Sequence, residues 1–344
     1  MGHKHSYLPP HSPLAFHIHA TGTTGLASQV TFTYNVSIMR AIVVKSWDTP
    51  PAFSADHPDP STTDPDKVTI KVLAAGLHQL VRSQAAGQHY SSKNAGLPYV
   101  PGADGVGTTP DGKTVYFSSL AMGGGFAENV TVPKAAVVPV PEGADPVQIA
   151  GLVNPGMSSW MALAARVDNL APNFTVVIVG VTAISGKVAV EFVRERGAGK
   201  VIGVARNPKE MEALKLDQSI VLASNPSETD FSALGDVDVI LDYLYGPVIP
   251  ALFAALNSKV PTQYVQIGSV AGLDTALPGA LLRSKNITMR GAGPGAWSLP
   301  HFGKELPGLL AAVARLPKMD LKVRKLEDAA DAWAAKKDRT VFVP

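Results

Sequence analysis

The stretch Phe174–Gly186, FTVVIVGVTAISG, decides the class of fold. Its residues 174–180 are mainly β-branched and apolar, which is typical of a strand buried on both faces of a parallel sheet. Gly180 and Gly186 then bound a short segment that leads into a helical pattern at residues 186–196. A strand that turns tightly into a helix offers backbone N–H groups and the positive end of the helix to a phosphate. The stretch therefore predicts the first strand–helix turn of a dinucleotide-binding domain.

This turn provides the first candidate cofactor residues. Glycine is needed where the backbone turns sharply or approaches a phosphate closely. The spacing is G-x-x-x-x-x-G instead of G-x-G-x-x-G, so the assignment depends on the strand before the turn and the helix after it. The alternative is that the glycines serve only the turn itself. We assign to cofactor binding Gly180, Thr182, Ala183, Ile184, Ser185 and Gly186.

The end of the next strand helps to choose the nucleotide. Residues 200–205, KVIGVA, are typical of a second strand, and Arg206 follows them directly. A domain that prefers NAD usually has Asp or Glu there to bind the ribose 2′-hydroxyl. A guanidinium pairs instead with a 2′-phosphate. The sequence therefore favours NADPH, the alternative being that Arg206 is an ordinary solvated arginine.

Strands and helices alternate through the rest of this half, which predicts a doubly wound parallel sheet. Further strands are expected at 220–222, 237–242 and 264–268, and helices at 207–216 and 247–257.

The first half has a different rhythm. Short strand-like runs are separated by glycine and proline turns, a pattern that predicts a small barrel-like β-domain. A connection rich in Pro and Asp covers residues 48–66, and a final strand-like piece at 340–343 is expected to return to this domain. The expected strands of the first half are 40–45, 68–75, 114–117, 126–132 and 137–140.

Composition excludes several classes of function. Lys and Arg number 30 against 28 Asp and Glu, a net charge of +2, and no basic run suggests nucleic acid as a partner. Cysteine is absent, which excludes disulfides, thiolate nucleophiles and zinc sites with sulfur ligands. No apolar run approaches the roughly 20 residues of a membrane helix. A chain without disulfides fits a reducing compartment, and we expect a cytoplasmic protein.

Residues 1–38 differ in composition from the rest. They hold five of the nine histidines and no acidic residue, and Lys4 is the one Lys or Arg before Arg40. An organelle transit peptide is expected to be rich in arginine. A gene-model artefact is a further alternative, and a disordered extension is the interpretation that we favour.

Several motifs resemble the medium-chain dehydrogenase/reductase superfamily, in particular its zinc-free quinone oxidoreductase-like branch. The resemblance runs from about Met39 to Pro344 and keeps the order of the motifs. It depends on Ala74–Leu77 (AAGL), Leu97–Gly107 (LPYVPGADGVG), Gly124–Glu128 (GGFAE), Asn154–Trp160 (NPGMSSW) and Tyr264–Ser269 (YVQIGS).

The resemblance implies a domain organisation. A GroES-like β-barrel catalytic domain is expected at 39–155 and again at about 296–344, and a Rossmann domain at 156–295. A homodimer is expected on the same ground. Zinc-dependent relatives carry Gly-His-Glu and an early cysteine, whereas this chain has Gly102-Ala103-Asp104 and no cysteine, so no metal is expected. Ala183 also stands where the family usually has glycine.

The resemblance extends to residues that would contact the substrate and the cofactor. Tyr90 is the candidate proton donor, because related enoyl-thioester reductases use a tyrosine in a similar place; the alternative is an aromatic residue without a catalytic role. Family positions that face the nicotinamide ribose match Asp242, Tyr243, Ile267, Gly268 and Ser269, although Asp242 could equally cap the following segment. Three residues of the Tyr90 segment are expected to orient the substrate: His78, Arg82 and His89. For His78 we favour a structural or steric role over an acid–base role.

The function expected from these residues is an NADPH-dependent reductase without a metal. Its substrate would be a small molecule, either a quinone or an α,β-unsaturated carbonyl compound. A short-chain reductase would need Tyr-x-x-x-Lys, and no tyrosine here has lysine four residues further on. The alternative outside catalysis is a module that binds NADPH and acts as a sensor.

Overall fold

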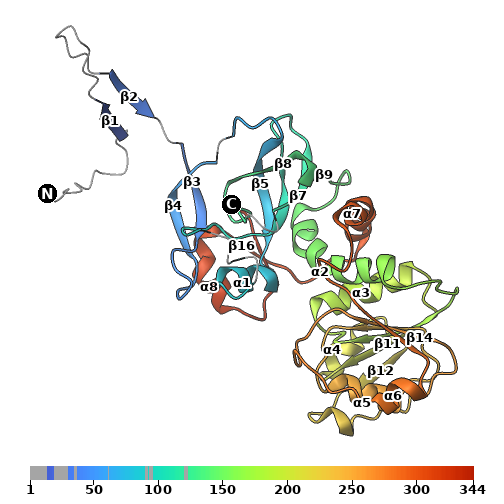
Figure 1. The fold of residues 1–344 in the computed structure, drawn as a ribbon. Coiled ribbons are helices and arrows are strands. Elements are labelled where there is room, and N and C mark those ends of the chain that lie inside the picture. The colour runs from blue at the N-terminus through green and yellow to red at the C-terminus, as the bar shows by residue number, and fades with distance from the viewer. Residues whose placement is uncertain are drawn as a thin grey trace. The chain divides into compact units, whose positions relative to one another are not determined.

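The computed structural model describes residues 14–18, 30–34, 37–60, 62–89, 92, 96–119 and 123–344 (Figure 1). The chain divides into two compact units. Unit 1 comprises residues 1–137, 323–338 and 342–344, and unit 2 comprises residues 138–322 and 339–341. Within the extension that we expected to be disordered, β1 (Leu14–Ile18) pairs antiparallel with β2 (Val30–Tyr34).

Unit 1 is built from short antiparallel strands, as the Gly- and Pro-punctuated sequence predicts. The longest strand, β5, pairs with both β6 and β8, and the larger sheet has the order β16-β17-β5-β6-β7-β9. A separate hairpin joins β3 to β4. The two sheets and their helices comprise β3 (Ile38–Val43), β4 (Ala52–Pro58), β5 (Lys67–Gly76), α1 (Gln79–Ala85), β6 (Asp104–Thr108), β7 (Thr114–Ser118), β8 (Asn129–Pro133), β9 (Val137–Pro139), β16 (Lys322–Arg324), α8 (Ala329–Ala334) and β17 (Thr340–Phe342). Strands β9, β16 and β17 each contain residues of both units.

The core of unit 1 joins its early strands to its C-terminal segment. Ile70 on β5 and Phe126 before β8 are fully buried with Phe342 on β17. The rings of Phe126 and Phe342 meet at an angle of 64° with centroids 4.9 Å apart, an edge-to-face contact. Phe342 of the C-terminal strand thus packs in one core with residues of the early strands.

Unit 2 contains a six-stranded parallel sheet in the order β12-β11-β10-β13-β14-β15. The chain runs outward from β10 in one direction and then restarts at β13 in the other, which is the doubly wound arrangement that the alternating pattern predicts. The elements are α2 (Pro146–Ala165), β10 (Thr175–Val179), α3 (Ile184–Glu195), β11 (Lys200–Ala205), α4 (Pro208–Glu212), β12 (Gln218–Val221), β13 (Val239–Asp242), α5 (Val248–Ala255), β14 (Thr262–Gln266), α6 (Gly279–Ser284), β15 (Ile287–Gly291) and α7 (Leu299–Arg315).

Both faces of this sheet are covered, which explains the continuous apolar run in β10. Val176 and Ile178 pack with residues of α3 on one face. Val177 and Val179 pack with residues of α5 on the other face. Each of these four valine and isoleucine side chains is fully buried, so each contributes roughly 1.5–3 kcal/mol of transfer free energy.

The division into units differs from the boundaries expected at residues 155 and 296. Helices α2 and α7 both belong to unit 2. Gly156 of α2 lies so close to α3 that an added Cβ would be 3.1 Å from Phe192. Gly308 of α7 would likewise bring a Cβ to 3.1 Å from Trp160 of α2. Small residues thus let α2 pack closely on α3 and α7 pack closely on α2, and this packing joins both helices to the Rossmann domain.

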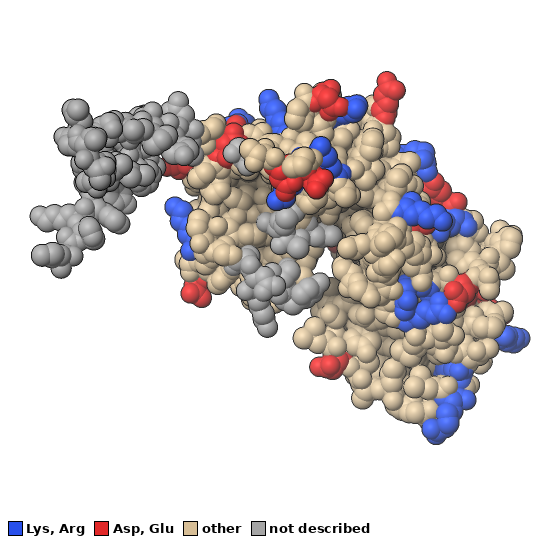
Figure 2. All heavy atoms as spheres, turned by 45° about the horizontal axis from the view of Figure 1, so that its top comes forward, with Lys and Arg blue, Asp and Glu red and all other residues tan. Residues whose placement is uncertain are grey.

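On the face drawn in Figure 2, basic and acidic side chains both occur, with uncharged areas between them. This face therefore carries no large patch of one charge. Among the described residues, no helix combines the length and the apolar character that crossing a membrane requires.

Candidate functional site

The turn after β10 has the sharp geometry that its glycines predict. Gly180 adopts φ 92°, a conformation that favours glycine, and its N–H donates to the carbonyl oxygen of Val204 at 2.8 Å. At Gly186 an added Cβ would be 2.6 Å from the Gly180 carbonyl oxygen. Glycine at these two positions therefore allows the start of α3 to lie directly against the end of β10.

Helix α3 begins with free backbone donors. The first hydrogen bond of the helix runs from the N–H of Lys187 to the carbonyl oxygen of Ala183, at 2.9 Å. The N–H groups of Ile184, Ser185 and Gly186 come before this bond and therefore have no partner within the helix. Ala183 is the N-cap residue, and its side chain makes no capping hydrogen bond. These N–H groups and the positive end of the helix can bind an anion.

Ala183, which replaces the usual family glycine, is not strained. Its backbone has φ −68° and ψ 155°, an extended conformation open to any residue. Its side chain is exposed. The turn thus keeps its shape without a glycine at this position.

Arg206 lies at the same edge of the sheet as the turn. It follows β11 directly, and Val204 of β11 pairs in register with Val179 of β10. Its side chain is exposed, and within the described ranges no carboxylate forms an ion pair with it. The guanidinium is therefore available to a phosphate.

Asp242, expected to face the cofactor, performs the capping role that was its alternative. Its side chain is fully buried at the end of β13. It accepts hydrogen bonds from the N–H groups of Leu244 at 2.8 Å and Tyr245 at 3.1 Å, and from the Tyr264 hydroxyl at 2.6 Å. Burial raises the pKa of this carboxyl, and the three hydrogen bonds oppose the shift.

The other residues expected near the nicotinamide lie at the ends of β13 and β14. The Asp242 carbonyl oxygen accepts from the N–H of Ile267 at 2.8 Å and of Gly268 at 3.0 Å. An added Cβ on Gly268 would be 2.6 Å from the Tyr243 carbonyl oxygen, so the two strand ends are in close contact. Tyr243 is buried, which raises its pKa to about 12, and its hydroxyl lies 3.3 Å from Ser158 Oγ. Ser269 follows in the half-buried segment after β14.

These positions together form one edge. The phosphate turn, Arg206, Asp242–Tyr243 and residues 267–269 follow β10, β11, β13 and β14, which are neighbours in the sheet. Ligands of doubly wound sheets bind at the carboxyl ends of the strands, where the strand order reverses. In this sheet the reversal lies between β10 and β13.

In unit 1, His78 is buried inside a hydrogen-bonded network. Its Nε2 lies 2.7 Å from Asp104 Oδ1, and the Tyr116 hydroxyl donates to Asp104 Oδ2 at 2.7 Å. The three residues are at most 1% exposed. Burial and the neighbouring Asp104 raise the pKa of Tyr116 well above its ordinary value. We expected His78 to orient substrate, and the structure places its Nε2 against a carboxylate.

Arg82, also expected to contact substrate, binds the end of α8. Its guanidinium donates to the carbonyl oxygens of Trp333 and Ala332, both at 2.8 Å. These are carbonyls that the last turn of a helix leaves without intrahelical partners. Burial lowers the Arg82 pKa.

His89 and Tyr90 follow α1. His89 is half-buried, and burial lowers its pKa. Tyr90, the candidate proton donor, lies outside the described residues.

Sequence reasoning missed the roles of Asp104 and Tyr116. Asp104 was noted only as a departure from the zinc-binding motif. The available signal was a carboxylate inside the glycine-rich run GADGVG, because such close backbone packing leaves a charged side chain little access to water. Within the described ranges, no group of three or more His, Cys, Asp or Glu is placed to hold a metal ion.

A doubly wound sheet with a phosphate-binding turn, in one chain with a β-domain, is the architecture of a nucleotide-dependent oxidoreductase. A probable NADPH-dependent quinone reductase of Emericella nidulans is 33% identical over 355 residues, covering 89% of this chain and 100% of that protein. A trans-enoyl reductase of Aspergillus terreus is 22% identical over 256 residues, covering 69% and 72% of the two chains.

Solved structures share the fold. The quinone oxidoreductase of Thermus thermophilus has a TM-score of 0.72 and 24% identity, covering 89% of this chain and 100% of that one. A probable oxidoreductase of Mycobacterium abscessus has a TM-score of 0.74 and 22% identity, with coverage of 90% and 100%. No family model matches the sequence. The chain belongs to the quinone oxidoreductase-like branch of the medium-chain dehydrogenase/reductase superfamily.

Proposed function

We propose that this protein is an NADPH-dependent reductase that transfers a hydride, without a metal, to a quinone or an α,β-unsaturated carbonyl compound. The observation that carries the proposal is the position of Arg206. It follows the strand next to the turn at residues 180–186, its side chain is exposed, and no carboxylate of the described residues forms an ion pair with it. Two relatives, a probable quinone reductase and a trans-enoyl reductase, support the substrate class. The resemblance also leads us to propose a homodimer.

The residues at the carboxyl edge of the sheet fit NADPH. The N–H groups of Ile184, Ser185 and Gly186 would hold the pyrophosphate, with the glycines providing room for its approach. Arg206 would hold the 2′-phosphate. When bound, the cofactor supplies the hydride through its nicotinamide ring.

The protein's own contribution is orientation and stabilisation of developing charge. The Asp242 carboxylate holds the backbone of residues 244 and 245, and its carbonyl holds residues 267 and 268. Asp242 thus orders both strand ends. On the substrate side, Tyr90 remains our proposed proton donor and His89 a proposed substrate contact. We propose that His78 and Arg82 act by shaping unit 1.

The test is a fluorescence titration of the full chain with NADPH and NADH. Arg206→Ala should weaken NADPH binding by about 10- to 100-fold, because a charge-assisted hydrogen bond contributes about 1.5–3 kcal/mol, and should leave NADH binding unchanged. Lys209→Ala, which removes another exposed cation three residues further on, is the matched control. An equal loss in both variants, or an equal loss for both nucleotides, would contradict the assignment.

The alternative, a module that binds NADPH without turnover, predicts the same titration. It differs in the second measurement, oxidation of NADPH in the presence of 1,4-benzoquinone or an enone, followed at the nicotinamide absorbance band. Steady oxidation that requires the protein supports the reductase. Tight NADPH binding with no oxidation across a panel of quinones and enones would leave only the binding module.

A further inference from the structure

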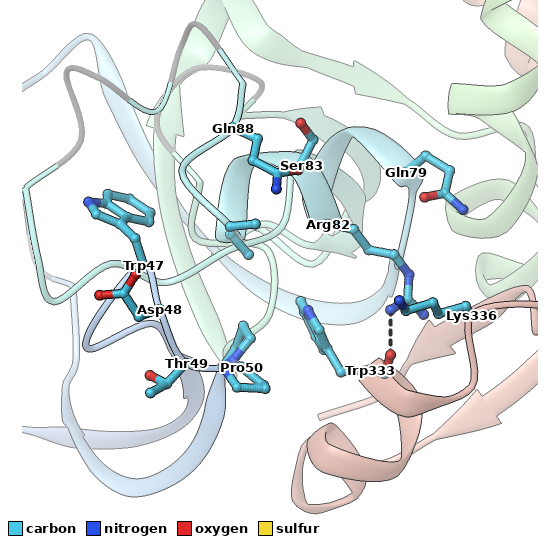
Figure 3. Close-up of a pocket in the computed structure, with 13 residues that line it drawn as sticks. Trp47, Asp48, Thr49, Pro50, Gln79, Arg82, Ser83, Gln88, Trp333 and Lys336 are labelled. Atoms are coloured by element: carbon cyan, nitrogen blue, oxygen red, sulfur yellow. Dashed lines mark hydrogen bonds between the residues drawn. The ribbon is translucent and has the colours of Figure 1, made fainter. Parts of the chain in front are cut away.

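Unit 1 contains a hollow of about 450 Å³ between α1, the turn after β3 and the end of α8 (Figure 3). Its volume lies within the range of roughly 300–1,000 Å³ that is usual for small-molecule sites. The proposed function does not use this hollow.

The apolar part of its lining is aromatic. Trp47 comes from the turn after β3 and Trp333 from α8, with Pro50 and Pro51 beside Trp47 in the chain. Both tryptophans are half-buried and so keep some exposed surface, although the Trp333 ring also stacks on Phe342. Flat indole faces favour flat partners, since stacked rings gain contact area and electrostatic attraction together.

The charged part of the lining is mainly positive. Arg82 and Lys336 lie together above Trp333 in Figure 3. The carboxylate in the lining is Asp48, and no ion pair joins it to either cation in the part of the chain that the structure describes. The lining therefore carries two positive charges against one negative charge.

Arg82 is positioned before any ligand arrives. Three carbonyl oxygens at the end of α8, those of Ala332, Trp333 and Ala335, accept from its guanidinium. Its charge also lies 5.7 Å from the centre of the Trp333 ring. Carbonyl oxygens orient a guanidinium but do not neutralise it as a carboxylate would. A half-buried cation held in this way is prepared to bind an anion.

We propose that this hollow is a binding site for a flat organic anion, an aromatic or conjugated carboxylate whose charge meets Arg82 and Lys336 and whose ring packs on the indoles. The site goes beyond the proposed function and does not depend on it.

The experiment is isothermal titration calorimetry of the full chain with 1-naphthoate, carried out with and without saturating NADPH. One molecule is expected to bind per chain in both conditions. The neutral isostere 1-naphthamide should bind at least about tenfold more weakly, because it loses the charge-assisted hydrogen bonds. Acetate, which has the charge without the ring, should also bind at least about tenfold more weakly.

Lys336→Gln places the binding in this hollow. It should weaken 1-naphthoate binding by about two- to fivefold, the size expected for an exposed ion pair. Lys337→Gln is the matched control, because Lys337 is equally exposed and does not line the hollow. Absence of saturable binding, equal binding of naphthoate and naphthamide, equal binding of inorganic phosphate, or an equal effect of the two lysine variants would each overturn the proposal.

Discussion

Each unit of this protein buries one aspartate beside a tyrosine hydroxyl, and the two sites differ in every other partner. Asp104 in unit 1 has Tyr116 at 2.7 Å and the titratable ring of His78 at 2.7 Å. Asp242 in unit 2 has Tyr264 at 2.6 Å, and its remaining partners are backbone N–H groups. The first carboxylate is thus bound to a side chain that can carry charge, and the second to neutral donors alone.

This difference separates two uses of a buried acid. Backbone N–H groups are fixed by the fold, so Asp242 serves to order the loops that follow β13. The Asp104 carboxylate contacts a ring nitrogen of His78, so Asp104 serves to fix the orientation of another side chain. Replacing either carboxylate by an amide of the same shape should show the difference.

The largest effect is expected for Asp104→Asn. The change removes the charged carboxylate that His78 and Tyr116 both contact, at a site where all three residues are buried. Removing one partner of a buried pair costs about 3–5 kcal/mol, and urea unfolding measures the loss. Asp111→Asn is the control, because Asp111 is exposed and its side chain pairs with its sequence neighbours Lys113 and Thr109. If both variants lost a similar amount of unfolding free energy, the network of His78, Asp104 and Tyr116 would not be a special source of stability.

A smaller effect is expected for Asp242→Asn. The amide oxygen can still accept from the backbone, and the Tyr264 hydroxyl can turn to accept from the amide NH₂ group. The loss in unfolding free energy should be about 1 kcal/mol, measured in the same urea experiment. A loss as large as that of Asp104→Asn would show that the loop needs the full charge of Asp242.

The smallest effect is a dependence on pH. Burial raises the pKa of Asp242, so the folded protein holds this proton more tightly than the unfolded chain does. Its contribution to stability is therefore fully present below the unfolded pKa of 3.8 and decreases as the pH rises through the folded value. The margin of the wild type over Asp242→Asn should shrink from about pH 4 towards neutral. If the stability advantage of the wild type over Asp242→Asn grew with pH, the pKa of Asp242 would be lowered in the folded protein and not raised.

Buried parallel strands were predicted best from the sequence. Strand β11 occupies the expected residues 200–205, and β10 differs from its expected range by one residue at each end. Their continuous β-branched runs have one physical explanation, burial on both faces. Strand β4 was missed, because it lies in the Pro- and Asp-rich connection and most of its residues are at least partly exposed. Helix α2 was missed because it is buried on most sides and so lacks a clear amphipathic pattern.

The candidate site was predictable where chain order alone determines position. The turn at 180–186, Arg206 and residues 267–269 lie at strand ends, which a parallel sheet brings to one edge. Side-chain partners were not predictable in this way. The contact of Arg82 with α8 joins residues about 250 positions apart, and no local pattern marks it.

Ala183 has a consequence for the unfolded chain. Its methyl group is compatible with the extended backbone at the start of α3, so the folded protein gains no strain from it. An unfolded chain with alanine has fewer conformations to lose on folding than one with glycine, a difference of about 0.4–1 kcal/mol. Alanine in place of the family's glycine therefore lowers the loss of conformational entropy when the turn at residues 180–186 folds, before any cofactor binds.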